Sequence, residues 1–230
     1  MLGGEGSRRV SYHPVAIVWP CPVPVETYVL AGRSVVVPRV ACPACFVPMV
    51  FWAGYERSVR VSGRCWRLWL ARGRCMGCRV SHVLLPSFLV IGRLDVAATI
   101  GLVLSGVRGD CGVRPAAGAV DVPHTTARGW VRSFRSKASL LWSGFVALTV
   151  ELGGGIPGAI PTDVCAATIV AMQCAHRASR GRHLLLTPGL WDFVSVVCGG
   201  LLIRSNMDPP WRVFGGRCFI PPLPFSGRPS

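Results

Sequence analysis

Residues 42–78 read CPACFVPMVFWAGYERSVRVSGRCWRLWLARGRCMGC, and this stretch decides the fold. It opens on Cys42-Pro-Ala-Cys45 and closes on Cys75-Met-Gly-Cys78. Two residues between paired cysteines allow a tight turn that aims both sulfurs at one metal ion, and two such turns supply tetrahedral thiolate coordination. The 29 residues between the motifs exceed the common spacing of roughly 15–20, but a longer hairpin absorbs the difference. We predict one structural zinc ion; a redox dithiol is the alternative.

Other potential ligands lie close to these motifs. Cys65 falls in the middle of the spacer and His82 just beyond the second motif, and either residue could replace a cysteine ligand. We expect neither to do so, with Cys65 an ordinary thiol and His82 a surface residue. Cysteine otherwise behaves as a small hydrophobic residue in protein cores, which is the role expected for positions 21, 111, 165, 174, 198 and 218.

The spacer between the motifs has the pattern of an antiparallel hairpin. Arg57–Val61 and Arg64–Ala71 alternate or carry β-forming residues around the turn Ser62-Gly63, which is typical of a hairpin. Arg57, Arg60 and Arg67 are opposed by few acids, and Tyr55, Trp66 and Trp69 are interleaved with the arginines. We predict that these arginines contact phosphate; the alternative is a solvated strand face. Upstream, Glu26–Leu30 and Ser34–Pro38 predict another hairpin.

Residues 95–137 have the pattern of a helix-turn-helix. A helix from Asp95, with Asp95 as its N-cap, precedes a break at Gly109–Gly112, a short helix over 114–120 and a third helix from Thr125 to Ser136, capped by Thr125. In the third helix four apolar residues follow i, i+3, i+4, i+7 spacing: Ala127, Trp130, Val131 and Phe134. The residues away from that face are Thr126, Arg128, Arg132 and Arg135. A recognition helix needs one buried face and one basic face, whereas an ordinary amphipathic helix is the alternative.

The chain is strongly basic. It carries 25 basic and 10 acidic residues, a formal charge of +15, with Lys137 the single lysine. Residues 1–94 contain 12 arginines and 3 acidic residues, a net charge of +9, whereas residues 95–150 and 151–230 each have a net charge of +3. GC-rich codons favour arginine over lysine but also supply Asp and Glu. An uncompensated positive field favours polyanionic partners, most often nucleic acid.

The sequence also bears on cellular location. The N-terminal apolar run is short and broken by prolines, which is unlike a signal peptide, and no uninterrupted apolar stretch reaches the ~18–20 residues of a spanning helix. We therefore expect a cytoplasmic protein with reduced thiols and no membrane partner, in which paired CxxC motifs indicate metal rather than disulfide.

The run from Cys42 to Val90, followed by GVRPAAGAVDVPHTTARGWVRSF at 112–134, resembles an uncharacterised family of high-GC bacteria with a transposase-like zinc ribbon before a helix-turn-helix. The resemblance extends over about residues 18–136 and, more loosely, over 189–206. The same stretch of sequence is also similar to the N-terminal DNA-binding part of insertion-sequence transposases. The resemblance implies DNA binding and a mobile-element ancestry.

Catalytic motifs are scarce. A three-acid transposase needs carboxylates on an α/β sheet to hold two divalent ions. The acids after residue 137 are Glu151, Asp163, Asp192 and Asp208, none framed by a strand pattern. No P-loop, nucleophile elbow or paired His–carboxylate arrangement is recognisable. We therefore expect no catalytic centre and no small-molecule substrate.

Together these patterns predict an α+β protein with a β-rich zinc ribbon, a helix-turn-helix and a C-terminal helical bundle. The expected parts are a flexible leader (1–14), the ribbon (15–94), the helix-turn-helix (95–137), a helical region (138–207) and an irregular Pro-rich tail (208–230). We predict a non-enzymatic, transposase-related DNA-binding protein that can form a homodimer through its C-terminal helices. The alternatives are a divalent-metal-dependent transposase or nuclease fragment and a protein-binding zinc-ribbon adaptor.

Overall fold

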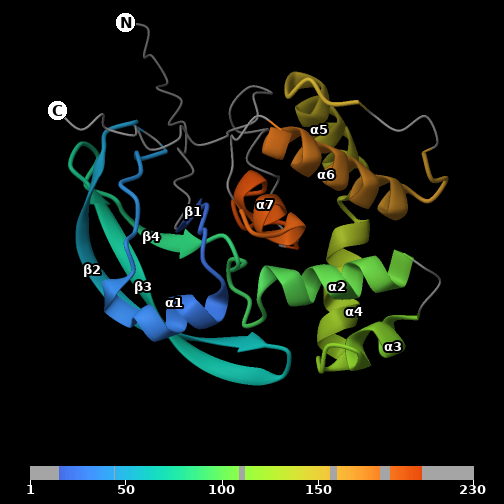
Figure 1. Ribbon diagram of the computed structural model, residues 1–230, viewed down its shortest axis with the longest axis horizontal. Coiled ribbons are helices and arrows are strands. Elements are labelled where there is room, and N and C mark those ends of the chain that lie inside the picture. Colours follow the sequence, from blue (N-terminus) through green and yellow to red (C-terminus); the bar gives the residue numbers. More distant parts are fainter. Residues whose placement is uncertain (1–15, 44, 109–111, 156–159, 182–186, 204–230) are drawn as a thin grey trace, which may run out of the picture.

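The chain combines a four-stranded sheet with helices that lie mainly to one side of it (Figure 1). The computed structural model describes residues 16–43, 45–108, 112–155, 160–181 and 187–203. The strands are β1 (Ala16–Trp19), β2 (Met49–Val61), β3 (Arg64–Cys75) and β4 (Ser81–Pro86). The helices are α1 (Val25–Ala31), the 3₁₀ turn η1 (Gly32–Ser34), α2 (Ala97–Arg108), α3 (Val113–Gly118), α4 (His124–Arg135), α5 (Ala138–Glu151), α6 (Val164–Gly181) and α7 (Leu190–Val197). The expectation of a mixed α+β fold is confirmed.

The long β2–β3 hairpin is the largest β element and confirms the hairpin predicted around Ser62-Gly63. Ser62 and Gly63 both have positive φ, 45° and 78°, which is the backbone twist that a two-residue hairpin turn requires. The strands extend well beyond the predicted segments, and the pairing register shifts between Phe51 and Ala53. This bulge leaves Trp52 as the extra residue of β2, which is an edge strand in the sheet order β1-β4-β3-β2.

The other half of the sheet contains a pairing that the local sequence pattern did not indicate. β1 runs parallel to β4, with Ala16 opposite Val83 and Trp19 opposite Pro86. A parallel pair needs a long crossover connection, and here the crossover contains α1 and the whole hairpin.

The hairpin predicted over Glu26–Leu30 and Ser34–Pro38 is wrong, because the first of these segments forms α1. Val25 and Tyr28 are buried at i, i+3 spacing, and the Tyr28 hydroxyl donates to the Trp69 carbonyl of β3 at 3.1 Å. Packing against the hairpin therefore overrides the β-forming character of this apolar segment.

Helices α2, α3 and α4 fall where the sequence predicted three helices, but both predicted N-caps are wrong. α2 begins at Ala97, and the Val96 carbonyl accepts its first hydrogen bond, from Ile100. Asp95 lies one residue earlier, where its carboxylate binds an arginine instead. α4 begins at His124, and the Pro123 carbonyl accepts from Thr126 and Ala127, so the helix includes Thr125.

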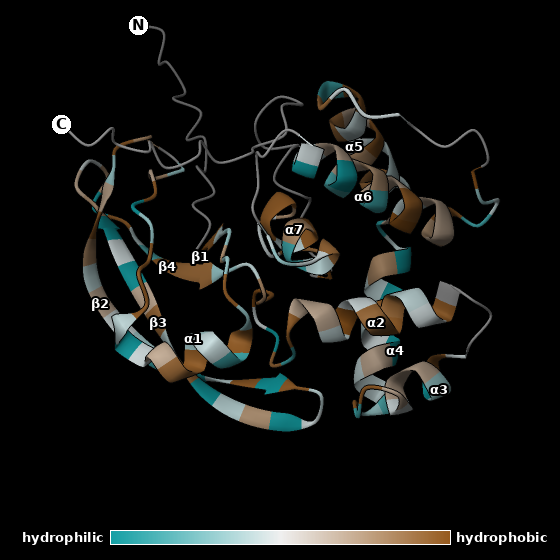
Figure 2. Ribbon diagram, in the orientation of Figure 1, coloured by the Kyte–Doolittle hydropathy of each residue, from teal (hydrophilic) through white to brown (hydrophobic). Residues whose placement is uncertain are grey.

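Three further helices, α5 to α7, follow in the region expected to be helical. Asp163 directly precedes α6, and its carboxylate accepts the Ala166 N–H at 2.7 Å and caps the helix. One buried cluster runs from Val18 to Ile203 and joins these helices to the sheet. Figure 2 shows β4 and α7, both mainly hydrophobic, near the middle of the molecule. None of the described helices is long and apolar enough to span a bilayer.

The predicted leader (1–14) and tail (208–230) lie outside the described residues, as do Cys111, Cys218 and Asp208. Cys21, Cys174 and Cys198 are buried, as expected for small core residues, and Cys165 is partly exposed.

The Asp192 carboxyl in the first turn of α7 predicts a pH-dependent stability. Burial raises its pKa to about 6, although its own N–H and that of Gly189 act in the opposite direction. A carboxyl whose pKa is higher in the folded than in the unfolded state (about 3.9) stabilises the fold fully below pH ~4, and that stability is lost as the pH rises through ~6. Relative to Asp192→Asn, the wild-type free energy of unfolding should fall by about 1–2 kcal/mol between pH 5 and 8. Urea denaturation across this range measures the difference, and superimposable pH curves for the two proteins would contradict it.

Candidate functional site

Two short turns that carry the CxxC motifs have the same backbone hydrogen bonds. In the first, the Cys42 N–H donates to the Val47 carbonyl at 2.9 Å and the Phe46 N–H to the Cys42 carbonyl at 2.9 Å. In the second, the same bonds join Cys75 to Val80 at 2.9 Å and Arg79 to Cys75 at 3.1 Å. The residue after each motif has positive φ, 58° at Phe46 and 64° at Arg79. We call these two turns the knuckles.

The four predicted cysteines meet at one point. Their sulfurs all lie within 4.8 Å of one another. The shortest separations cross between knuckles, 3.6 Å from Cys42 to Cys78 and 3.1 Å from Cys45 to Cys75. Sulfurs bound to one tetrahedral ion at about 2.3 Å lie roughly 3.8 Å apart. The arrangement can therefore hold a metal ion after small adjustments. Among the described residues, these four form the group of metal-ligating side chains that fits one ion.

The local environment favours the thiolate form of Cys75. Burial opposes ionisation of Cys75, but hydrogen bonds from Cys45, from the N–H groups of Cys78 and Gly77 and from the Cys78 side chain together lower its pKa to about 6. A β-carbon at Gly77 would lie 3.2 Å from the Cys45 sulfur, so glycine lets the backbone approach the cluster. Cys42 and Cys75 are buried, and Cys45 and Cys78 are partly exposed.

His82 is not the surface residue that we expected. It is fully buried on β4, and its Nε2 lies 3.9 Å from the Cys42 sulfur. A ring nitrogen at this distance can donate to a ligand thiolate and orient it, as outer-shell groups of metal sites do. Cys65 is exposed and adjoins the hairpin turn, pairing with Arg60. It therefore lies at the opposite end of the hairpin from the knuckles.

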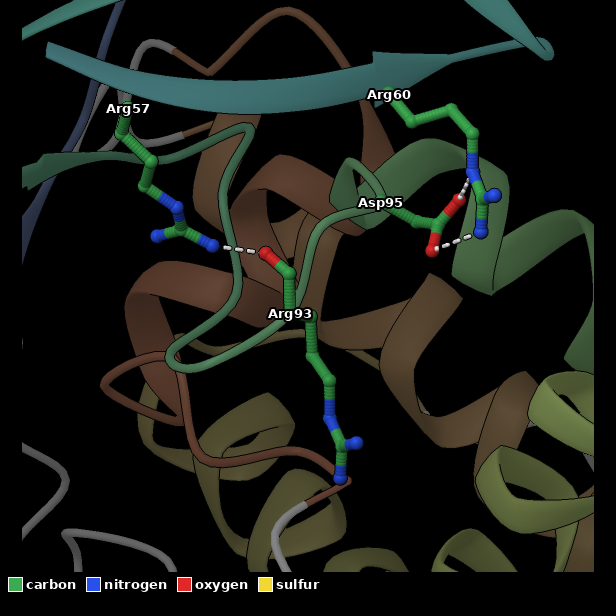
Figure 3. Close-up of polar contacts among 4 residues, drawn as sticks. All are labelled: Arg57, Arg60, Arg93 and Asp95. Carbon is green, nitrogen blue, oxygen red and sulfur yellow. Dashed lines mark hydrogen bonds and ion pairs between the residues drawn. The ribbon is translucent and has the colours of Figure 1, made fainter. Parts of the chain in front are cut away.

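Two of the arginines predicted to contact phosphate are engaged within the protein (Figure 3). Arg60 forms a bidentate pair with the buried Asp95, at 2.7 and 3.0 Å. Arg57 donates to the Arg93 carbonyl. Both contacts join β2 to the loop before α2, and the Arg60 backbone pairs with that loop as well. Arg67 differs, because it is 75% exposed and its partner Glu56, at 3.1 Å, is also exposed. DNA contact by Arg57, Arg60 and Arg67 stays a prediction.

The hairpin turn also contacts the segment between α3 and α4. A side chain at position 63 would displace the Asp121 carboxylate, and the φ of 78° there favours glycine in any case. The end of the hairpin remote from the knuckles is thus bonded to Asp95 and lies against Asp121.

Helix α4 has the two faces that the sequence predicted. Ala127, Trp130, Val131 and Phe134 are all buried, and the exposed side chains include Arg128, Arg132 and Arg135. Thr126 is partly exposed and borders a surface pocket of about 400 Å³. The pocket is lined by Arg93, Thr125, Thr126, Gly129, Trp130, Arg132, Ser133 and Ser136.

Sequence reasoning missed Arg93, Ser133 and Ser136 as parts of this surface. Positions 125, 129, 132, 133 and 136 share one side of a helix at i+3 and i+4 spacing, so a polar stripe was recognisable. Arg93 could not be recognised from the sequence, because only the tertiary fold brings it close to α4. Its guanidinium also donates to the Ile203 carbonyl at 3.1 Å.

Comparisons of the chain with protein-family models, with curated proteins and with solved structures gave no match. The resemblance to a transposase-like zinc-ribbon family therefore stays a prediction.

Proposed function

We propose that the protein binds duplex DNA through α2–α4, which act as a helix-turn-helix with α4 as the recognition helix. The observation that carries the proposal is the division of α4 into a fully buried apolar face and an exposed face with Arg128, Arg132 and Arg135. Guanidinium groups on an exposed helix can bind both phosphates and guanine edges in the major groove.

In this proposal the four-cysteine cluster holds a structural zinc ion. Four thiolates leave no open coordination position, so the ion serves the fold rather than catalysis. Hairpin β2–β3 and the knuckles then form a zinc ribbon. Its remote end, which is bonded to Asp95 and lies against Asp121, supports the loop before α2 and the turn before α4. The ribbon thereby fixes the orientation of the recognition helix α4.

Arg128→Ala together with Arg132→Ala should weaken binding to duplex DNA about tenfold or more at moderate salt, because loss of even one guanidinium–base or guanidinium–phosphate contact costs 1–3 kcal/mol. The slope of log affinity against log salt should become shallower by about 1–2. Fluorescence anisotropy on a labelled random-sequence duplex measures both quantities, and circular dichroism checks the fold.

The matched control is Arg177→Ala with Arg180→Ala. It removes the same charge from exposed positions of α6, so it separates net charge from the α4 surface. Equal losses in the two double variants would mean that α4 has no special role, and wild-type protein that ignores DNA at low salt would refute the proposal.

A further inference from the structure

The edge strand β2 exposes aromatic side chains beside the metal centre. Phe51 is 65% exposed and Trp52 57% exposed; Phe51 directly precedes the register shift in β2, and Trp52 is its extra residue. A bulge of this kind redirects side chains and interrupts pairing. Solvent-facing aromatics of this size on an edge strand are a liability for aggregation, so their presence points to a ligand.

Both rings are supported from the neighbouring strand β3. Trp69 lies 5.7 Å from Phe51, with the ring planes tilted by 35°, and it occupies the space beside Gly54 that a side chain would fill. The Arg74 guanidinium lies 4.8 Å from the centre of the Trp52 ring. Each ring thus contacts one side chain of β3, while more than half of its residue's surface remains exposed for stacking.

The charge beside these rings is positive. Arg72 and Arg74 are partly exposed and lie on β3 next to the bulge, Arg72 opposite Ala53 in the register. The ion pairs among the described residues are Arg60–Asp95 and Arg67–Glu56, so no carboxylate of that part of the chain neutralises Arg72 or Arg74. A second copy of this basic surface would be repelled, whereas a polyanion would be attracted.

We propose that Phe51, Trp52, Arg72 and Arg74 form a binding surface for unpaired nucleotides of single-stranded nucleic acid. Bases stack on the exposed ring faces, and the arginines pair with the phosphates between them. A duplex does not fit this chemistry, since its base faces are covered by neighbouring bases. The surface belongs to the knuckle end of the hairpin, and α4 lies at the other end (Figure 1). The proposal therefore extends the proposed function to a second site but does not require the first.

The test uses the full-length, zinc-loaded protein and the double variant Phe51→Ala, Trp52→Ala. Affinity for the 12-nucleotide probes dT12 and U12 and for a 12-base-pair duplex is measured by anisotropy at low salt. Stacking contributes about five- to 150-fold per base, so the variant should bind the preferred single strand at least tenfold more weakly. Its affinity for the duplex should change less than twofold. The tighter of dT12 and U12 identifies the source as DNA or RNA.

Two further variants make the result specific. Trp52→Phe, in the background with Phe51 intact, keeps a ring for stacking and should retain most of the affinity for the single strand. Val150→Ala removes a comparably exposed apolar side chain, 60% exposed on α5, and should have no effect. Zinc content and thermal melting confirm that each variant is folded.

Unchanged single-strand affinity in the double variant would overturn the proposal. It would also be overturned if sedimentation showed a wild-type dimer that the variant abolishes without loss of oligonucleotide binding, because the surface would then dock a second copy. Loss of duplex binding in Arg128→Ala, Arg132→Ala tests the other site, so the two proposals fail independently.

Discussion

Replacement of Cys42 and Cys75 by serine should release the metal and unfold the N-terminal half of the protein. These are the two buried cysteines of the cluster, one from each knuckle. Structural zinc in small domains contributes apparent free energies of about 10–16 kcal/mol, as much as the whole stability of a typical domain, about 5–15 kcal/mol. Elemental analysis should find one zinc per wild-type chain and none in the variant, and circular dichroism should show loss of the cooperative melting transition.

Cys65→Ser is the matched control, because this exposed thiol lies beside the hairpin turn and outside the cluster. It should keep both the zinc and the melting temperature. Wild-type protein that contains no zinc when purified under reducing conditions, yet melts as a folded protein, would contradict the metal assignment.

Arg60→Ala should strongly destabilise the protein, although Arg60 lies far from the four-cysteine cluster. Asp95 is 2% exposed, so removing the guanidinium leaves a buried carboxylate without its bidentate partner. Breaking a buried ion pair on one side costs about 3–5 kcal/mol. Urea denaturation should show a loss of this size, and the loss should shrink when Asp95→Asn is added, because the neutral amide is less costly to bury.

Arg67→Ala provides the comparison, since Arg67 and Glu56 are 75% and 51% exposed. A surface pair of this kind contributes between 0 and about 1 kcal/mol. If the two arginine variants lost equal stability, the contact of Arg60 with Asp95 would have no structural role.

The features that the sequence predicted well depend on local chemistry. A CxxC motif restricts its own turn, Ser62-Gly63 fixes a two-residue hairpin loop, and the spacing from Ala127 to Phe134 marks a helical face. Each of these patterns involves only a few neighbouring residues, so the local structure that it predicts depends little on distant parts of the chain. The co-location of four cysteines also follows once the hairpin is recognised.

The features that were missed depend on contacts between distant segments. Local pattern favoured a hairpin over residues 26–38, yet packing of Tyr28 against β3 produces a helix. Asp95 looked like a helix cap because its partner, Arg60, is remote in sequence. His82 looked exposed because nothing nearby in the sequence shows that β4 lies next to the four-cysteine cluster.

The parallel pairing of β1 with β4 has a consequence for how the molecule is assembled. Residues 16–19 find their partners only at residues 83–86, after both knuckles and the complete hairpin. Closing such a long loop is entropically costly and slow in an unstructured chain, but a folded hairpin brings the two ends closer. During synthesis β1 must therefore wait until β4 has left the ribosome before the two strands can pair.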